Sequence, residues 1–129
     1  MARRLISSGG PWEARFGYSR AVVVGDMAFV SGTTDAGPDG RSTHPGDPAA
    51  QARAIFGIID RALGEAGFAL TDVVRTRIFV TDRDNIAPVA SVQGELFNEI
   101  RPASTALVVK ALIDPSLLVE IEVDARKSA

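Results

Sequence analysis

Residues 100–125 read I-R-P-A-S-T-A-L-V-V-K-A-L-I-D-P-S-L-L-V-E-I-E-V-D-A, and this stretch determines how the rest of the chain can fold. It predicts two strands, at 105–111 and 117–123, joined by a connection that contains proline. Neighbouring side chains of a strand point to opposite faces of a sheet. The second strand therefore has two faces, an apolar one and an acidic one, made respectively by Val119, Ile121 and Val123 and by Glu120, Glu122 and Asp124. A row of carboxylates is typical of a solvated or salt-bridged face, so the neighbouring strands must decide its role.

A further strand at 73–80 offers the charges that would complement this row. Its alternation places Val74, Thr76, Ile78 and Val80 on one face and Arg75, Arg77 and Phe79 on the other. If the two strands are neighbours, arginines and carboxylates form cross-strand pairs that each contribute a few tenths of a kcal/mol, about 0.2–1. A face that is partly apolar and partly charge-paired suits a subunit interface, and we expect an oligomer.

The first third of the chain predicts a hairpin. Apolar runs at 21–24 and 27–31 flank Gly25-Asp26, and glycine reaches the positive φ that a tight hairpin turn requires. A short strand at 3–7 precedes the hairpin, whereas residues 12–19 show no period and predict no element. The run at 36–48 is rich in Gly, Pro, Asp and Ser and is typical of a loop.

Two amphipathic helices follow. Asp47 can cap the first helix, Pro48 suits its first position, and Gly67 ends it. Its apolar residues recur at helical spacing and should face the core: Ala52, Ile55, Phe56, Ile59, Leu63 and Ala66. The second helix, at 88–98, should bury Val89, Val92, Leu96 and Phe97, although Gly94 costs about 1 kcal/mol relative to alanine.

The order of elements predicts an α+β fold. Strands and helices succeed one another as three strands, a helix, a strand, a helix and two strands. Crossovers of the same sense lie on the same side of a sheet, so we predict one domain, spanning 1–129, with a mixed six-stranded sheet and both helices packed on one face.

Composition excludes several function classes. The 129 residues carry a net charge of −2 and contain no cysteine. Without excess positive charge, nucleic-acid binding is not expected, and without cysteine there is no disulfide, thiolate nucleophile or cysteine zinc site. We see neither a membrane span nor a signal-peptide core, and expect a cytoplasmic protein with no membrane partner.

Motifs for phosphate loops, nucleophile elbows and metalloprotease helices are absent. The only histidine, His44, lies in the predicted loop and is interpreted as solvated. The carboxylates of the acidic row are expected to pair with arginines, so we predict no metal and no cofactor. Proton transfer by a carboxylate remains, with hydroxyl and backbone groups holding a small molecule. Gly32 would let such a ligand approach the main chain closely, although a structural turn explains it equally.

Several segments, in the same order along nearly the whole chain, resemble the RidA family, also called YjgF/YER057c or L-PSP endoribonuclease-like. The matching segments are G-Y-S-R-A-V at 17–22, F-V-S-G at 29–32, Q-A-R at 51–53, A-G at 66–67, D-V-V-R-T at 72–76, F-V-T-D at 79–82, R-P-A at 101–103 and V-E-I-E at 119–122.

This resemblance implies a chorismate-mutase-like fold, a homotrimer and small-molecule clefts between subunits. In the best-known branch it also implies hydrolysis of enamines and imines to 2-oxo acids and ammonia. Carried over by position, the site would contain Tyr18, Ser31 and Glu120, with Glu120 acting through water. The arginine that binds the substrate carboxylate in that branch falls on Ser104, and the asparagine falls on Ala90. A hydroxyl replaces neither the charge nor the fork geometry of a guanidinium.

Three interpretations of Ser104 stay open. It starts a strand in a cleft without function; with Thr105 it binds a different ligand; or an arginine at 15, 20 or 101 supplies the charge from another direction. Three functions are weighed separately: a hydrolase or deaminase of enamine-type molecules, a non-catalytic ligand-binding module, and a ribonuclease. The acidic balance disfavours the ribonuclease.

Overall fold

Six strands form one mixed sheet in the spatial order β1-β2-β3-β6-β4-β5. The structure is a computed structural model, and it describes residues 2–128. All neighbouring strands are antiparallel except β4 and β5, which are parallel. The strands are β1 Arg3–Ile6, β2 Ala21–Val24, β3 Met27–Thr33, β4 Val73–Val80, β5 Ala103–Val108 and β6 Val119–Arg126. The prediction of a mixed six-stranded sheet is confirmed.

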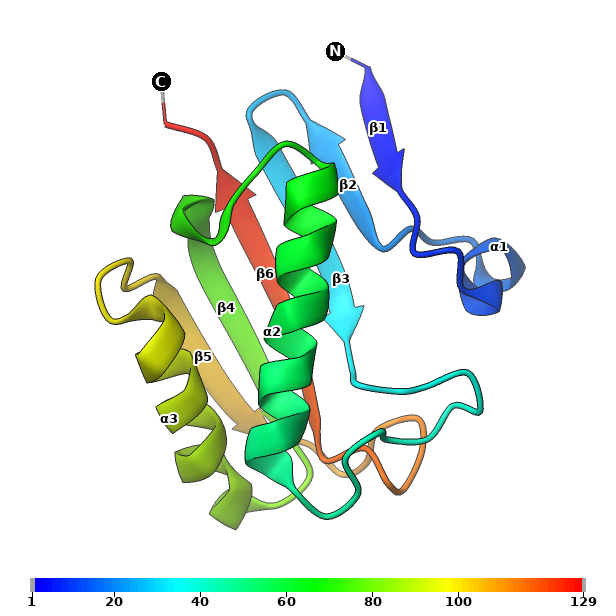
Figure 1. The fold of residues 1–129 in the computed structure, drawn as a ribbon, viewed down its shortest axis with the longest axis vertical. Coiled ribbons are helices and arrows are strands. Elements are labelled where there is room, and N and C mark those ends of the chain that lie inside the picture. Colours follow the sequence, from blue (N-terminus) through cyan, green and yellow to red (C-terminus); the bar gives the residue numbers. More distant parts are fainter. Residues whose placement is uncertain (1, 129) are drawn as a thin grey trace.

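Two long helices, α2 (Pro48–Glu65) and α3 (Ile86–Phe97), cover the same face of this sheet (Figure 1). The opposite face carries no helix and is called the open face below. A short helix, α1 (Pro11–Phe16), lies beyond the β1 end of the sheet, and two 3₁₀ turns precede β4 and α3 at Leu70–Asp72 and Arg83–Asn85. Within residues 2–128, no helix is long and apolar enough to cross a membrane.

Helix α2 is built as its sequence predicts. The Asp47 carboxylate accepts a hydrogen bond from the Ala50 amide (3.0 Å), and Gly67 adopts a φ of +84° just beyond the helix. The apolar positions predicted to face the core are all buried: Ala52, Ile55, Phe56, Ile59, Leu63 and Ala66. Burial of these side chains against the sheet is the main driving force for this layer.

The alternation of β6 is also confirmed. Val119, Ile121 and Val123 are 0% exposed under the helices. The three carboxylates lie on the open face, where the predicted charge pairs form: Arg77 Nη1 lies 3.3 Å from both Glu122 and Asp124, and Arg75 Nε lies 3.9 Å from Asp124. These pairs arise because β6 inserts between β3 and β4.

Val74, predicted to share a strand face with Thr76, Ile78 and Val80, and Leu96, predicted to face inward, are both exposed. Val74 is 46% exposed because the β4–β6 register shifts between Val73 and Arg75, so that Val73 rather than Val74 enters the core. A bulge of this kind reverses the alternation on one side of the extra residue. Leu96 is 40% exposed, and α3 buries Val89, Val92 and Phe97 instead.

Element boundaries differ at three places. The strand predicted at 105–111 begins at Ala103 and ends at Val108, and the following strand runs to Arg126 rather than 123. Helix α3 begins at Ile86, before its proline. Helix α1 was not predicted, since six residues are too few to show a helical period.

The segment between β3 and α2 is held in place by a buried amide. Gln51 is 0% exposed, and its Nε2 donates to the carbonyls of His44 (3.1 Å) and Ser116 (3.0 Å). Its Oε1 accepts from the Leu118 amide (2.9 Å). This one side chain therefore joins the long segment before α2 to the connection before β6.

Candidate functional site

Glu120 lies on the open face near the start of β6, beside the end of β3. The β3–β6 register shifts between Val30 and Thr33, which brings Gly32 directly beneath the Glu120 side chain. A Cβ atom at position 32 would overlap Glu120 Oε2 and would lie 3.0 Å from Cδ. The missing side chain of Gly32 thus leaves the space that the carboxylate occupies.

The environment of Glu120 favours its neutral form. Burial raises the pKa of the carboxyl above its ordinary value of 4.5, and the negative charge of Glu122 raises it further, while Arg20 acts in the opposite direction. A carboxyl with a raised pKa can donate a proton at a pH nearer to neutrality and accept it back. Perturbed carboxyls of this kind gather at functional sites.

Arg20 supplies the positive charge that lowers the pKa of this carboxyl. Its Nη2 donates to the Gly32 carbonyl (2.6 Å), which fixes the guanidinium beside the bulge. Its Nε is buried and has no partner among residues 2–128. An unpaired buried donor costs free energy, so it marks a place where a further acceptor would be stabilised.

Ser31 and Tyr18 lie at the same end of the sheet. The Ser31 hydroxyl donates to the Ser19 carbonyl (2.7 Å), so it fastens the segment that carries Tyr18 to β3. Gly17, in the left-handed conformation (φ +71°), ends α1 just before Tyr18, whose side chain is 42% exposed. Of the residues predicted for the site, Tyr18, Ser31, Gly32 and Glu120 are therefore grouped within one chain.

Ser104 lies elsewhere. It pairs in register with Thr76 on the helix-covered side, and a hydrogen bond of 2.8 Å joins their hydroxyls. Thr76 also donates to Gln93 Oε1 (2.7 Å), and Gln93 Nε2 donates to Ser104 Oγ (3.1 Å). Because Thr76 has one proton, the Ser104 proton completes the third bond, and the three side chains form a closed ring. Thr105 is the neighbour of Ser104, pairs in register with Arg77 and faces the open side.

Within a single chain, Ser104 is too far from Glu120 for both side chains to contact one small molecule. Glu120 is level with Phe79 on β4, and Phe79 is level with Leu107 on β5. Ser104 is three residues from Leu107, so it is displaced from Glu120 by about 10 Å along the strands and about 10 Å across them. Their side chains also point to opposite faces. A site that uses both requires a second copy of the chain.

His44 is half exposed in the segment before α2, as the sequence predicts. Its Nδ1 lies 3.4 Å from the buried Asp35 carboxylate, which also accepts from Ser42 and Thr43 hydroxyls (2.8 and 3.1 Å). Among residues 2–128, no three histidine or acidic side chains are placed to hold a metal ion.

The family follows from comparison with known proteins. A family model described as "Endoribonuclease L-PSP" matches residues 11–127. The crystal structure of Rv2704 from Mycobacterium tuberculosis, described as a member of the YjgF/YER057c/UK114 family, is 46% identical and superposes with a TM-score of 0.88, covering 98% of this chain and 100% of that one. The chain belongs to the YjgF/RidA family.

Two further proteins are similar to this RidA-family chain over nearly its whole length. SCO2049 of Streptomyces coelicolor, named an uncharacterized protein, is 39% identical over 128 residues, which cover 99% of this chain and 95% of the relative. E. coli TdcF, whose crystal structure contains bound serine, is 27% identical with a TM-score of 0.77, covering 97% of this chain and 94% of that one. The chorismate-mutase-like α+β fold expected from the resemblance is confirmed.

Sequence reasoning identified Arg20 only as one of three possible sources of charge, and it missed Gln93 entirely. Arg20 directly precedes a strand, but its contact with the Gly32 carbonyl depends on how β2 and β3 pair. Gln93 is one polar residue on an amphipathic helix, and only the parallel β4–β5 pair brings Thr76 and Ser104 within its reach.

Proposed function

We propose that this RidA-family protein binds a small metabolite in a cleft between subunits of a homotrimer, where Glu120 transfers protons during the hydrolysis of an imine or enamine. The observation that carries the proposal is the Glu120 carboxylate, half-buried over Gly32 with a raised pKa. Tyr18, Ser31 and Gly32 would line the same end of the cleft. The exposed edge strand of another subunit would line the facing side, with Thr105 on its open face and Ser104 on its helix-covered face.

The chemistry needs one group that both donates and accepts a proton. Neutral Glu120 would protonate the substrate, at nitrogen in an imine or at carbon in an enamine, which becomes an iminium ion. Water then adds to the carbon of the C=N bond, and its proton passes to the carboxylate. The carboxyl then gives its proton to the amine nitrogen, the C–N bond breaks and releases ammonia, and the hydroxyl proton returns to the carboxylate as the carbonyl group forms, so that the sum is imine plus water to ketone plus ammonia. General acid–base catalysis of this kind contributes about 10²–10⁴-fold in rate.

The assembly is supported by the surface that one chain exposes. Strand β5 is an edge strand, and all six of its residues are exposed. Leu107 and Phe29 on the open face are 48% and 41% exposed. Apolar surface of this kind, mixed with paired charges, is typical of interfaces. A neighbouring copy would also supply the half of the site that one chain lacks. The serine bound to E. coli TdcF supports a small polar ligand.

The test is ammonia release when the protein is added to 2-aminoacrylate or 2-aminocrotonate, generated in place by a pyridoxal-phosphate dehydratase. The proposal predicts acceleration that falls about 100-fold or more in Glu120→Gln, which cannot donate or accept the proton. Glu122→Gln is the matched control, since it lies two residues away on the same face and pairs with Arg77; it should retain activity. Full activity in Glu120→Gln would exclude this role.

The alternative is a non-catalytic module that binds a small ligand. The closed ring of Thr76, Gln93 and Ser104 favours it, because the ring occupies the hydroxyl at the position where the resemblance places the arginine. This function predicts a ligand-dependent rise in Tm without product, since a ligand that binds only the folded state stabilises it by mass action. Ammonia release that depends on Glu120 would exclude it.

A further inference from the structure

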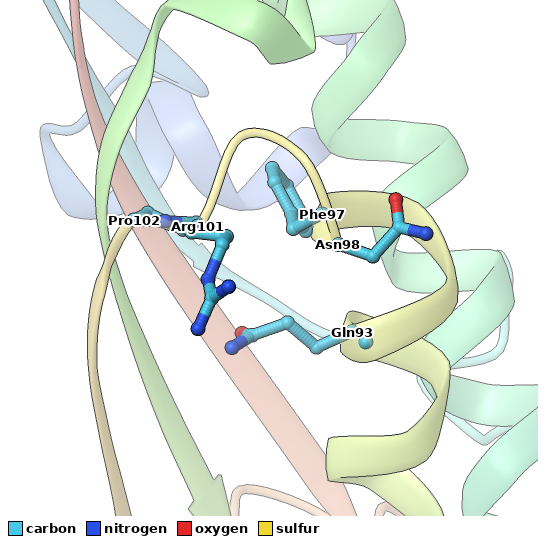
Figure 2. A pocket seen from close by; sticks show the side chains of 6 residues that line it. Gln93, Phe97, Asn98, Arg101 and Pro102 are labelled. Atoms are coloured by element: carbon cyan, nitrogen blue, oxygen red, sulfur yellow. The ribbon is translucent and has the colours of Figure 1, made fainter.

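A hollow of about 420 Å³ opens between the C-terminal half of α3 and the turn that leads into β5. Gln93, Gly94, Phe97, Asn98, Arg101 and Pro102 line it. In Figure 2 the Arg101 guanidinium and the Gln93 amide point toward one another across this hollow. Its wall therefore presents N–H donors from two different elements at one place.

The backbone at Arg101 is unusual. With a φ of +52°, Arg101 is the only non-glycine residue among those described that adopts a positive φ. Its amide donates to the Phe97 carbonyl (2.8 Å), so the turn is anchored to the buried end of α3. A side chain other than glycine, asparagine or aspartate is disfavoured in this conformation. The conformation sets the direction in which the guanidinium leaves the turn.

Arg101 also lacks a charged partner. None of the ion pairs formed by residues 2–128 includes it, and no hydrogen bond from its guanidinium is present. The carboxylate on α3, Glu95, is paired with Arg53 of α2 (2.6 Å), and Glu99, which is two residues before Arg101 in the chain, is exposed and does not line the hollow. The guanidinium keeps its full set of donors available for a ligand.

Gln93 is held in one orientation by its bonds to Thr76 and Ser104. Its Oε1 accepts from Thr76 and one N–H of Nε2 donates to Ser104, so one N–H of the amide remains. The hollow thus combines a free guanidinium fork with a fixed amide donor, and no carboxylate is among the residues that line it. A planar, negatively charged acceptor fits such a set, because a guanidinium binds a carboxylate through two parallel charge-assisted hydrogen bonds.

We propose that the hollow binds the carboxylate of a small organic acid, with Arg101 as its charged anchor and Gln93 as a second donor. The inference deepens the proposed function, on which it rests for its place in a reaction: it assigns the carboxylate end of the ligand to the Ser104 side of the cleft. Binding itself involves only α3 and the turn before β5, so it can be measured without turnover.

The experiment is an NMR titration with pyruvate, followed at the backbone amide of Gly94 and the Nε–H of Arg101. The neutral analogue 2-oxopropanamide has the same shape without the charge. Saturable shifts at these two signals are expected with pyruvate and not with the amide. Arg101→Ala should weaken pyruvate binding by about 10- to 100-fold, the range for loss of a charge-assisted pair. Arg83→Ala removes another exposed arginine beside α3 and should leave binding unchanged.

A second pair of variants tests the hollow itself. A Cβ atom at position 94 would meet nothing within 4 Å, so Gly94→Leu should fold, fill the hollow and abolish the pyruvate-dependent shifts. Gly57→Leu on α2 is the matched control, because position 57 is equally open but lies outside the hollow. Unchanged binding in Gly94→Leu would overturn the proposal.

Three further outcomes would also overturn the proposal. Pyruvate and its amide could shift the two signals equally, or Arg101→Ala could bind pyruvate as tightly as wild type does. The third is displacement of pyruvate by inorganic phosphate at equal concentration, which would indicate a general anion site. Glu120→Gln separates this inference from the proposed function. If Glu120→Gln binds pyruvate as wild type does, and neither Glu120→Gln nor Arg101→Ala changes ammonia release, the carboxylate site is supported and the proposed chemistry is wrong.

Discussion

At the residue scale, the Glu120 carboxylate occupies the space that a side chain at position 32 would fill. Glycine at this position is explained by the carboxylate above it rather than by backbone strain, since Gly32 is not among the residues with positive φ. A substitution here would move the catalytic candidate without disturbing the core. A substitution at Gly32 should therefore change activity without changing the stability of the fold.

Gly32→Ala should leave the fold nearly intact and remove most Glu120-dependent activity. The added Cβ overlaps the end of a flexible side chain, which can rotate away at little cost, but the carboxylate then leaves its position. The measurement is ammonia release alongside Tm. Gly57→Ala, which places a methyl group in open space on α2, is the control and should keep full activity. Full activity in Gly32→Ala would contradict the assigned geometry.

The raised pKa of Glu120 predicts a specific dependence of stability on pH. As pH rises from the ordinary value of 4.5 through the folded-state pKa, the folded state binds more protons than the unfolded state, so the free energy of unfolding contributed by Glu120 falls. Glu120→Gln does not titrate and should gain stability relative to wild type as pH rises above 4.5, as measured by urea unfolding.

Glu95→Gln provides a control of opposite sign for this pH series. Its hydrogen bond from Arg53 lowers the pKa of Glu95, so the charged form stabilises the fold above the unfolded pKa and that contribution is lost as pH falls. Glu95→Gln should therefore lose stability relative to wild type as pH rises. The same trend in both variants would show that the shift at Glu120 has the wrong sign.

The sequence predicts one ligand site that also includes Ser104 and Thr105. The structure groups Tyr18, Ser31, Gly32 and Glu120 at one end of the sheet, and their role in binding stays a prediction. The sequence could not predict where Ser104 points, because that depends on the parallel pairing of β5 with β4. Nor could it choose among the arginines at 15, 20 and 101. The unpaired guanidinium in the hollow favours Arg101 as the source of charge on the Ser104 side, and Arg20 lies with Glu120.

At the scale of elements, strand alternation and helical spacing predicted β6 and α2 because each signal repeats several times within one element. The predictions from sequence are wrong where a single extra residue shifts the pairing of two strands. The bulge at Val74 reverses the alternation of β4, and the shift between Val30 and Thr33 places Gly32 under Glu120. Both irregularities depend on pairing with β6, which lies far along the chain and leaves no local signal.

Gln51 joins three elements through backbone groups, and its loss should be costly. Gln51→Leu leaves the carbonyls of His44 and Ser116 and the amide of Leu118 without partners. Each buried unsatisfied group costs about 1–3 kcal/mol, so the free energy of unfolding should fall by about 3 kcal/mol or more. Urea unfolding measures this loss.

The control for Gln51→Leu is Asp60→Ala, an exposed position on the same helix, which should change stability by less than about 0.5 kcal/mol. If Gln51→Leu unfolds at the same urea concentration as wild type, water or a rearranged backbone satisfies these groups and the amide is not what holds the two segments together.

At the scale of the whole molecule, one chain contains two incomplete halves of a site. Glu120 with Arg20 lies on the open face, and Arg101 with Gln93 lies beside the helix layer at an exposed edge strand. The proposed trimer would bring copies of these surfaces together and bury the exposed apolar residues of the open face. The proposed activity therefore depends on assembly as much as on Glu120.

Size measurement in solution should give a trimer of about 41 kDa, three times the 13.6 kDa of one chain. Leu107→Glu places a charge on the open face of the edge strand and should shift the protein to monomers without activity. Ile113→Glu, at a position 88% exposed in the connection before β6, is the control and should remain a trimer. A monomeric wild type that is fully active would contradict the shared site.

The decisive measurement mixes two inactive variants. Glu120→Gln and Arg101→Ala subunits are unfolded together, refolded and assayed for ammonia release, with each variant alone as control. If Glu120 of one subunit works with Arg101 of another, random mixing restores both groups at roughly a quarter of the sites in a closed symmetric ring, and activity returns to about that fraction of wild type. If the mixture stays as inactive as its components, the two groups do not act across a subunit boundary, and the shared site is wrong.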